Sequence, residues 1–356
     1  MESAELRELL TPEALALLDS LEPSTSTDDV VRLVGRLRRD GHPAGRVAAV
    51  LSQYRLRRRA AAKFGPFAER MLFTEGGLEQ ATRLRVAALH AGRFAAAGLE
   101  HVADLGIGGD AMAMAAIDLR VTAVERDEVT AALAAYNLAP WPTARVVHGD
   151  LASIDLDGVD GIWLDPARRE GARRLADPGD VVELVLWSGR LARPGIGRAA
   201  LVLGTDDSAH ELTAEHDSDD AAVGALGEWV YEPDGAVIRA RLIGLLAGRL
   251  GGRMLDPTIA YITADRLTPT PFARAFRVLE RWPLDVRVLR RELAARDIGV
   301  LEIKKRGVDI DPAVLRPKLQ LRGEHSAVLI LTRAAGEKVA LLAERADEPP
   351  RATSSG

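Results

Sequence analysis

The chain has 356 residues, of which 47% are hydrophobic and 28% charged, and its net charge is −5. This balance is ordinary for a globular protein with room for more than one domain, and it does not suit a uniformly basic nucleic-acid coat. The sequence has no cysteine, which excludes disulfides, thiolate metal sites and cysteine nucleophiles. We therefore expect a protein of the reducing cytoplasm.

Membrane and metal partners are also not expected. No apolar run reaches the roughly 18 residues that a membrane-spanning helix needs, and the seven histidines lack the spacing of metal ligands. The first ten residues, MESAELRELL, are acidic and amphipathic, which is not typical of a signal peptide. The sequence leaves the oligomeric state open.

Residues 1–98 are predicted to be a helical region. Apolar residues recur at three- and four-residue spacing, Pro12 can begin a helix, and Gly65 can end one. Ser, Thr and Asp residues before one segment are suitable helix caps. The predicted helical segments are SAELRELLTPEALALLDSL, STSTDDVVRLVGRLRRD, AGRVAAVLSQYRLRRRAAAKFG and TEGGLEQATRLRVAALHAGRFAAAG.

Charge is distributed unevenly along the chain. Residues 32–63 include ten basic residues and one acidic residue, whereas residues 206–234 include ten carboxylates and no Lys or Arg. A cationic region on an acidic protein suggests a defined anionic partner. The alternative is that the arginines only form an exposed helix face. We assign no role to the acidic stretch.

From residue 101 the pattern changes to short apolar segments that end on Gly or a carboxylate. Such strands, separated by helical stretches, predict a Rossmann-like α/β core with a parallel, doubly wound sheet over residues 99–245. A region at 246–345 is predicted to end in a small α/β module, and 346–356 to be a disordered tail. The predicted core strands are HVADLG, RVTAVE, ARVVHGD, GIWLD, VVELVLW and RAALVLG, and the predicted module elements are IGVLEIKKRG, DPAVLRPKL, HSAVLILTR and KVALLAE.

A glycine-rich turn follows the first of these strands, which ends at Asp104. Glycines permit a tight turn and a close approach of the backbone to a ligand. Glu125 ends the next strand, 19 residues after Gly106, close to the roughly 20-residue spacing of an acid that holds ribose hydroxyls. Asp150 follows the third strand. The glycines of the turn are Gly106, Gly108 and Gly109.

Two classes of cofactor compete for this turn. A dinucleotide would place its pyrophosphate there, but Asp104 and Asp110 flank the turn with negative charge. S-adenosylmethionine (SAM) has a sulfonium and an ammonium group, which favour nearby carboxylates. We therefore favour SAM. A glycine turn with three incidental acids explains less, because all three acids lie at strand ends.

Asp165 and Pro166 end the fourth strand. Ligands of open α/β sheets bind beyond the carboxyl ends of the strands, so Asp165 is expected at the same cleft. Asp-Pro there resembles the (D/N)-P-P-x loop of amino-methylating enzymes, in which the acid orients an exocyclic amine. Arg168 and Arg169 could bind a phosphate or a base edge. The alternative is a plain turn beside a solvated surface.

Taken together, these motifs make the sequence similar to a family of bacterial class I SAM-dependent methyltransferases with a THUMP-like C-terminal domain. The family implies a helical N-terminal region, a Rossmann-like core and a small α/β module. Because THUMP domains bind RNA in tRNA-modifying enzymes, the resemblance implies an RNA partner. The resemblance rests on KFGPFAERMLFTEGGLEQAT, DLGIGGDAMAMA, WLDPARR, EPDGAVIRARL, AYIT and IGVLEIKKRGVDIDPAVLRPKLQLRG.

The resemblance also implies residue roles. The acids and glycines of the turn would hold the methionine part of SAM, Glu125 the ribose and Asp150 the adenine. Thr74 and Gln80 would lie near the mouth of the cofactor site, and Asp165-Pro166 would orient the acceptor. The residues implied for the methionine part are Asp104, Gly106, Gly108, Gly109 and Asp110.

One segment departs from the family pattern. VVELVLW begins only 16 residues after Asp165, and the intervening residues include Gly171, Pro178 and Gly179. A parallel crossover needs about 10–12 residues at least. The core is therefore expected to be shortened after Asp165, which bears on the acceptor pocket and on activity.

The C-terminal module has a basic segment at Lys304, Lys305 and Arg306. Residues 301–333 include seven basic and four acidic residues, which favours contact with phosphates. A solvated charged face is the alternative. Few aromatic residues are interleaved, so base stacking is not predicted.

The leading hypothesis is a SAM-dependent methyltransferase that acts on a base amino group of tRNA or rRNA. A non-catalytic RNA-binding protein with a relict SAM fold is a second hypothesis. A methyltransferase for small molecules or proteins is a third.

Overall fold

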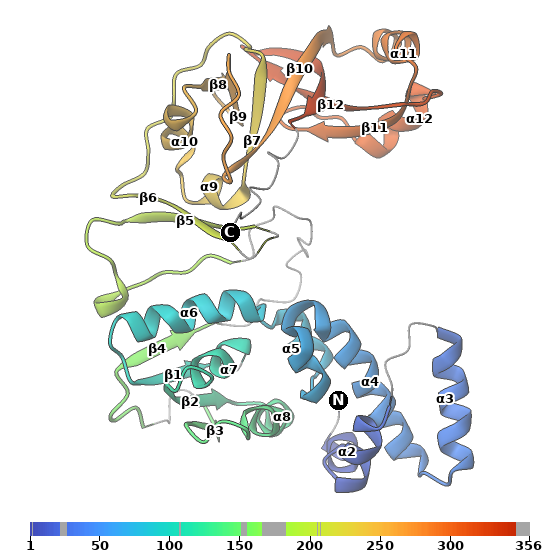
Figure 1. Cartoon of the computed structure of the whole chain (residues 1–356), viewed down its shortest axis with the longest axis vertical. Coiled ribbons are helices and arrows are strands. Elements are labelled where there is room, and N and C mark those ends of the chain that lie inside the picture. Colours follow the sequence, from blue (N-terminus) through green and yellow to red (C-terminus); the bar gives the residue numbers. More distant parts are fainter. Residues whose placement is uncertain are drawn as a thin grey trace, which may run out of the picture. The chain divides into compact units, whose positions relative to one another are not determined.

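The computed structural model describes residues 1, 3–21, 27–106, 108–150, 155–165, 183–204, 206 and 208–346. The chain divides into two compact units, Met1–Arg173 (unit 1) and Arg174–Gly356 (unit 2), which we describe separately (Figure 1).

Unit 1 begins with the helical region that the sequence predicts. Pro12 is the first residue of α2, and the Thr11 side chain accepts a hydrogen bond from the Ala14 N–H, as an N-cap does. Gly65 ends α4 with a positive φ of 55°, a conformation that glycine adopts without strain. The last predicted segment forms two helices, because residues 81–83 interrupt it. The helices are α1 (Ser3–Leu9), α2 (Pro12–Asp19), α3 (Thr27–Arg39), α4 (Ala44–Phe64), the 3-10 turn η1 (Gly65–Arg70), α5 (Glu75–Gln80) and α6 (Leu84–Ala96).

The second half of unit 1 is a parallel four-stranded sheet in the order β3-β2-β1-β4. The chain moves outward from β1 to β3 and then crosses back to β4, so a switch point lies between β1 and β4. Ligands of open α/β sheets bind at such points. The elements are β1 (His101–Leu105), α7 (Gly109–Ala115), β2 (Arg120–Glu125), α8 (Glu128–Leu138), β3 (Ala144–His148) and β4 (Gly161–Leu164).

The two faces of β4 differ in burial. Gly161 approaches Phe94 of α6 so closely that an added β-carbon would lie 3.0 Å from its ring, and Trp163 on the same face is buried. Ile162 and Leu164 point to the other face and are 50% and 56% exposed. β4 is the last strand of this sheet within the described residues.

The prediction of a fifth strand in VVELVLW is wrong for its described residues. Residues 183–187 have no regular structure, and Leu184 and Leu186 are largely exposed. The strand predicted in RAALVLG is present as β5 (Arg198–Leu203), but it pairs antiparallel with β6 (Ala209–Ala214) in a separate two-stranded sheet. An alternating apolar pattern favours a strand, yet it does not determine which edge that strand pairs with.

Unit 2 contains a mixed seven-stranded sheet in the order β11-β12-β13-β10-β7-β9-β8, in which only β11 and β12 are parallel. The predicted elements of the C-terminal module are confirmed as β11, α12, β12 and β13. The other strands were not predicted. The elements are β7 (Trp229–Pro233), α9 (Gly235–Arg239), α10 (Ile243–Arg249), β8 (Arg253–Asp256), β9 (Ile259–Ala264), β10 (Ala273–Pro283), α11 (Val286–Ala295), β11 (Ile298–Lys305), α12 (Pro312–Leu319), β12 (His325–Ala334) and β13 (Glu337–Arg345).

The seven-stranded sheet of unit 2 is strongly coiled. Three strands separate β11 from β7 in the sheet, yet Lys304 of β11 lies 2.7 Å from Glu232 of β7. One core cluster includes Tyr261 and Phe276, and a second, with Leu289 and Leu315, packs α11 and α12 against the sheet (Figure 1).

Candidate active site

The carboxyl end of β1 carries a buried acid, Asp104, that has no cationic partner among the described residues. Asp104 is 0% exposed, and neither of its carboxylate oxygens accepts a hydrogen bond of normal geometry within the described chain. Burial, together with repulsion from Asp110 and Asp165, holds the pKa of Asp104 well above its usual range. A buried carboxylate in this state favours either a proton or a cation.

The glycines after β1 are required by close backbone approaches. Gly106 has φ +122°, and a β-carbon there would lie 3.2 Å from the Asp165 carbonyl oxygen. A β-carbon at Gly109 would lie 2.8 Å from the Thr82 carbonyl oxygen. Gly108 is the N-cap residue of α7. The loop is therefore a tight backbone cradle next to Asp104.

Asp110, in the first turn of α7, is held by a neighbouring helix. Its Oδ1 lies 2.7 Å from Nδ1 of His90 on α6, and both residues are buried. The His90 ring stacks on Trp163 of β4, with ring centroids 4.4 Å apart. His90 could not be predicted from the sequence, because a lone histidine on a helix face belongs to no motif.

Glu125 and Asp150 follow the neighbouring strands. Glu125 is the last residue of β2 and is half-buried, and its Oε1 accepts a hydrogen bond from the Asp127 N–H at 2.9 Å. Asp150 is exposed and lies two residues beyond β3. Because the strands are parallel, both acids lie at the carboxyl ends of the strands, as Asp104 does.

Thr74 and the glycine loop line the same cavity, which has a volume of about 70 Å³. Thr74 caps α5 by accepting the Gly77 N–H at 3.0 Å, and it lines the cavity together with Gly108 and Gly109. Gln80 does not line it and is exposed at the end of α5. Most of the remaining lining is apolar and comes from the end of α4, residues 71–73, α5, α7 and α8.

Side chains from two helices clamp the segment before Thr74. Buried Gln53 of α4 donates to the Phe73 carbonyl at 2.8 Å and accepts the Phe73 N–H at 2.9 Å. Asn137 of α8 pairs with the backbone of Leu72 in the same way, at 2.8 and 2.9 Å. The segment is thus bonded like a strand although it belongs to no sheet. No spacing rule in the sequence indicates this clamp, because its partners lie 20 and 65 residues apart in the chain.

Part of the cationic region 32–63 has an internal role. Arg57 is buried, donating to the Met71 carbonyl at 2.9 Å and to Asp19 at 2.7 Å. Lys63 donates to the carbonyls of residues 78, 79 and 81 at 2.7–2.9 Å, and so binds the carboxyl end of α5. These cations stabilise the wall of the cavity.

Asp165 follows β4 directly and is exposed. Its backbone carbonyl borders Gly106, which places it at the switch point of the sheet. Pro166, Arg168 and Arg169 lie outside the described residues. Within the described chain no cluster of acids and histidines could hold a metal, and no helix is long and apolar enough to cross a membrane.

In unit 2, two of the three basic residues predicted to contact phosphate instead contact other side chains of the same unit. Lys304 is only 14% exposed and forms an ion pair with Glu232. The Arg306 guanidinium lies 5.2 Å from the ring centroid of Tyr261. Only Lys305 is exposed, and it has no ion pair with any described residue.

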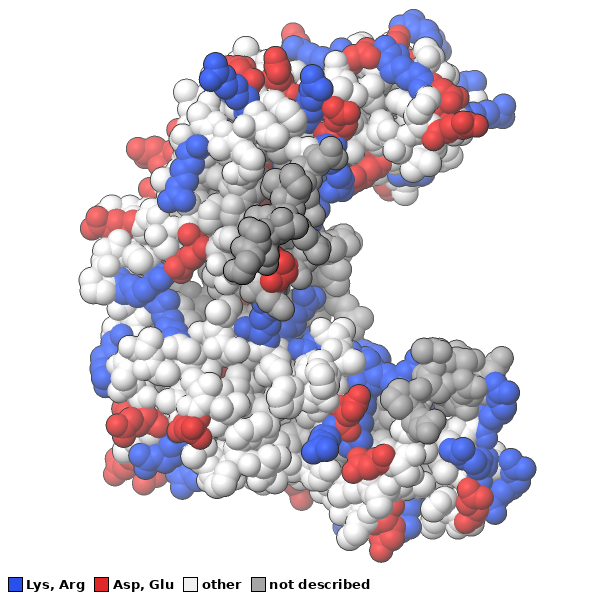
Figure 2. Space-filling model, viewed as in Figure 1, with Lys and Arg blue, Asp and Glu red and all other residues white. Residues whose placement is uncertain are grey.

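Other cations of unit 2 are exposed on its two C-terminal helices. On the face shown in Figure 2, Lys and Arg side chains stand out over α11, with Asp and Glu side chains between them. Five of the cations on α11, on α12 and just beyond it have no ion pair within the described part of the chain. They are Arg287, Arg290, Arg316, Lys318 and Arg322.

Two family models match parts of the chain. A THUMP domain-like model matches residues 273–345, which span β10 to β13. A domain of unknown function, DUF8688, matches residues 2–60, which lie within the N-terminal helices.

Two curated relatives are uncharacterized S-adenosylmethionine-dependent methyltransferases from Mycobacterium tuberculosis strains CDC 1551 / Oshkosh and H37Rv. Each is 36% identical over 336 residues, covering 78% of this chain and 90% of the relative. Because 78% of this chain is fewer than 336 residues, the relatives have residues at positions where this chain has none.

A crystal structure from Porphyromonas gingivalis W83, of a protein proposed to be a methyltransferase, has a similar fold. The TM-score is 0.67, with 21% identity, and the match covers 94% of this chain and 98% of the other.

Because Gln53 belongs to the clamp and Gln80 does not, their alanine variants should differ in the free energy of unfolding. Gln53→Ala leaves the buried N–H and C=O of Phe73 unpaired, which is expected to lower the free energy of unfolding by about 3 kcal/mol. Gln80→Ala, at an exposed helix end, should change it by less than about 0.5 kcal/mol. Urea denaturation followed by circular dichroism measures both. Equal losses would contradict the clamp.

Because Asp104 is buried, the difference in stability between the wild type and Asp104→Asn should depend on pH. Because the folded protein holds the Asp104 proton more tightly than the unfolded chain, stability from this group is complete at low pH. It is lost as the pH rises from the ordinary Asp value of about 3.9 towards the raised pKa. Asp104→Asn removes this penalty, so its melting temperature should exceed that of the wild type at pH 7 and converge with it near pH 4. A variant less stable than wild type at both pH values would contradict this assignment.

Proposed function

This chain belongs to the S-adenosylmethionine-dependent methyltransferases, and from that premise we propose that it methylates an exocyclic amino group of a base in tRNA or rRNA. The observation that carries the proposal is the exposed Asp165 beside the glycine loop, at the switch point of the sheet.

The residues at the carboxyl ends of the strands fit the cofactor. Asp104 is a buried carboxylate with no cationic partner among the described residues, and the SAM ammonium group would supply the missing positive charge. Gly106 and Gly109 leave no room for a side chain, because a β-carbon there would meet the backbone of Asp165 or Thr82. The loop therefore presents bare main chain beside Asp104, which suits close contact with the methionine part. Glu125 and Asp150 would hold the ribose and the adenine. When bound, the cofactor supplies the methyl group.

Asp165 would act on the acceptor. Its carboxylate accepts a hydrogen bond from an exocyclic N–H and so directs the nitrogen lone pair towards the cofactor side of the cleft. Exposure suits this role, because a base must reach the group from solvent. This assignment makes Asp165 a catalytic residue through positioning and electrostatics.

An RNA substrate is supported by unit 2. The THUMP domain-like match covers 273–345, and within it lie the five exposed cations of α11, α12 and the segment just after α12. Cations that have no internal partner can neutralise phosphates without a loss of ion pairs. Because Lys304 and Arg306 are already engaged, Lys305 and these cations are the better candidates for phosphate contact. A small-molecule substrate would leave them without a role.

The test is methyl transfer from labelled SAM to unmodified tRNA and rRNA transcripts, with mass spectrometry of the nucleosides. Asp165→Ala should reduce transfer by roughly 100-fold, since an interaction made in the transition state is lost, while SAM binding is retained. Asp165→Asn keeps an acceptor oxygen and should retain more activity than Asp165→Ala.

Undiminished transfer by Asp165→Ala would reject the role of Asp165. Transfer by the wild-type protein to a protein or a small molecule, with none to RNA, would reject the RNA substrate.

A further inference from the structure

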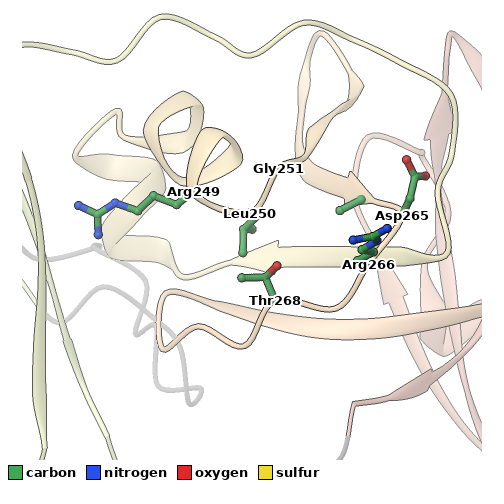
Figure 3. Close-up of a pocket in the computed structure, with 7 residues that line it drawn as sticks. Arg249, Leu250, Gly251, Asp265, Arg266 and Thr268 are labelled. Carbon is green, nitrogen blue, oxygen red and sulfur yellow. The ribbon is translucent and has the colours of Figure 1, made fainter.

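Unit 2 has a cavity of about 340 Å³, which lies between the end of α10 and the loop after β9 (Figure 3). It lies outside the segment 273–345 that matches the THUMP domain-like model. None of the residues discussed for methyl transfer lines it. The lining residues are Arg249, Leu250, Gly251, Ala264, Asp265, Arg266 and Thr268.

The cavity is positively charged. Arg249 and Arg266 are exposed, and neither forms an ion pair with any described residue. The one carboxylate in the lining, Asp265, is already held by both guanidinium nitrogens of Arg253, at 2.8 and 3.0 Å. Its charge is therefore compensated, and the two other arginines are left to attract an anion.

The loop that contains Arg266 and Thr268 is held in place by hydrogen bonds to a buried tyrosine. The Tyr231 hydroxyl donates to the Arg266 carbonyl at 3.2 Å and accepts the Thr268 N–H at 2.7 Å. Tyr231 is 0% exposed and belongs to the core cluster that also contains Leu250. Both walls of the cavity are thus anchored in one core, which limits the loss of entropy when a ligand binds.

The arrangement of the side chains favours an extended anion. In Figure 3, Arg249 extends to one side from the end of α10, whereas Arg266 lies on the other side, with Leu250 and Thr268 between them. Two guanidinium groups that diverge do not enclose a single phosphate. They can contact separate phosphates of one strand while the sugar lies over the apolar and hydroxyl surface between them.

We propose that this cavity binds the sugar-phosphate backbone of the RNA substrate, through Arg249 and Arg266. The inference rests on the proposed RNA methylation and extends the RNA contact surface of unit 2 beyond the THUMP domain-like segment. The contact is electrostatic and independent of base sequence.

The experiment measures the affinity of the full-length protein for a fluorescently labelled, unmodified tRNA transcript between 50 and 300 mM salt, roughly the range over which phosphate contacts weaken. Arg249→Ala/Arg266→Ala should weaken binding about tenfold at the lower salt concentrations and reduce the salt slope by about two, one for each lost phosphate contact. Affinity for SAM, measured in parallel, should be unchanged.

The matched control is Arg277→Ala/Arg281→Ala. It removes the same charge from exposed positions on β10, but these arginines are already paired with Glu344 and Glu337. It should change RNA affinity much less. Equal weakening by both double variants would mean that only net charge matters and would overturn the proposal.

Two further outcomes separate the possible failures. RNA binding by the wild type that is unchanged in Arg249→Ala/Arg266→Ala would overturn the cavity assignment and leave the RNA substrate in place. No RNA binding by the wild type would overturn the RNA substrate itself. Displacement of RNA by inorganic phosphate, beyond that by chloride at equal ionic strength, would indicate a site for one free anion and contradict the extended-strand assignment.

Discussion

The feature on which the rest of the site depends is a fully buried carboxylate that has no cationic partner within the described part of the chain. Removing an acid from water without a cation or hydrogen-bond donors is costly, and a folded protein retains such a group where a ligand compensates for it. Asp104 is in this situation at the carboxyl end of β1, with Asp110 and Asp165 close enough to raise its pKa further. The glycine turn beside it packs closely against the backbone of Asp165 and Thr82, and His90 holds Asp110 in place. This arrangement of charges suits a cation, in agreement with the sulfonium and ammonium groups of SAM.

The N-terminal helices contribute to this site rather than merely preceding it. Gln53 and Arg57 of α4 bind the backbone of the segment that leads to Thr74, and Lys63 binds the carboxyl end of α5. Basic residues that the sequence presents as a cationic surface are therefore partly a means of fixing one wall of the cavity. This division of roles explains why the segment MLFT keeps an extended form without a neighbouring strand.

The parts of the structure that depend on local pattern were predictable from the sequence. Pro12, Gly65 and the glycine turn determine backbone conformation directly, and the four strands of the parallel sheet follow from short apolar runs that end on an acid. Features that depend on distant contacts were not predictable. The alternating pattern in VVELVLW contains no information about a partner edge, and no spacing rule links Gln53 to Phe73 or Lys304 to Glu232. The residues proposed for the site came from motifs, whereas the clamp, the His90 contact and the basic cavity came from the fold.

The most direct measurement is calorimetric titration with SAM at pH values from 5 to 7, for the wild type and for Asp104→Asn. Asp104 must be ionised to pair with the ammonium group, and its pKa is raised in the absence of a cation. We expect wild-type affinity to increase over this range, and Asp104→Asn to bind more weakly and with a flatter pH dependence. Equal affinity and an equal pH slope for the two proteins would contradict the central role of this carboxylate.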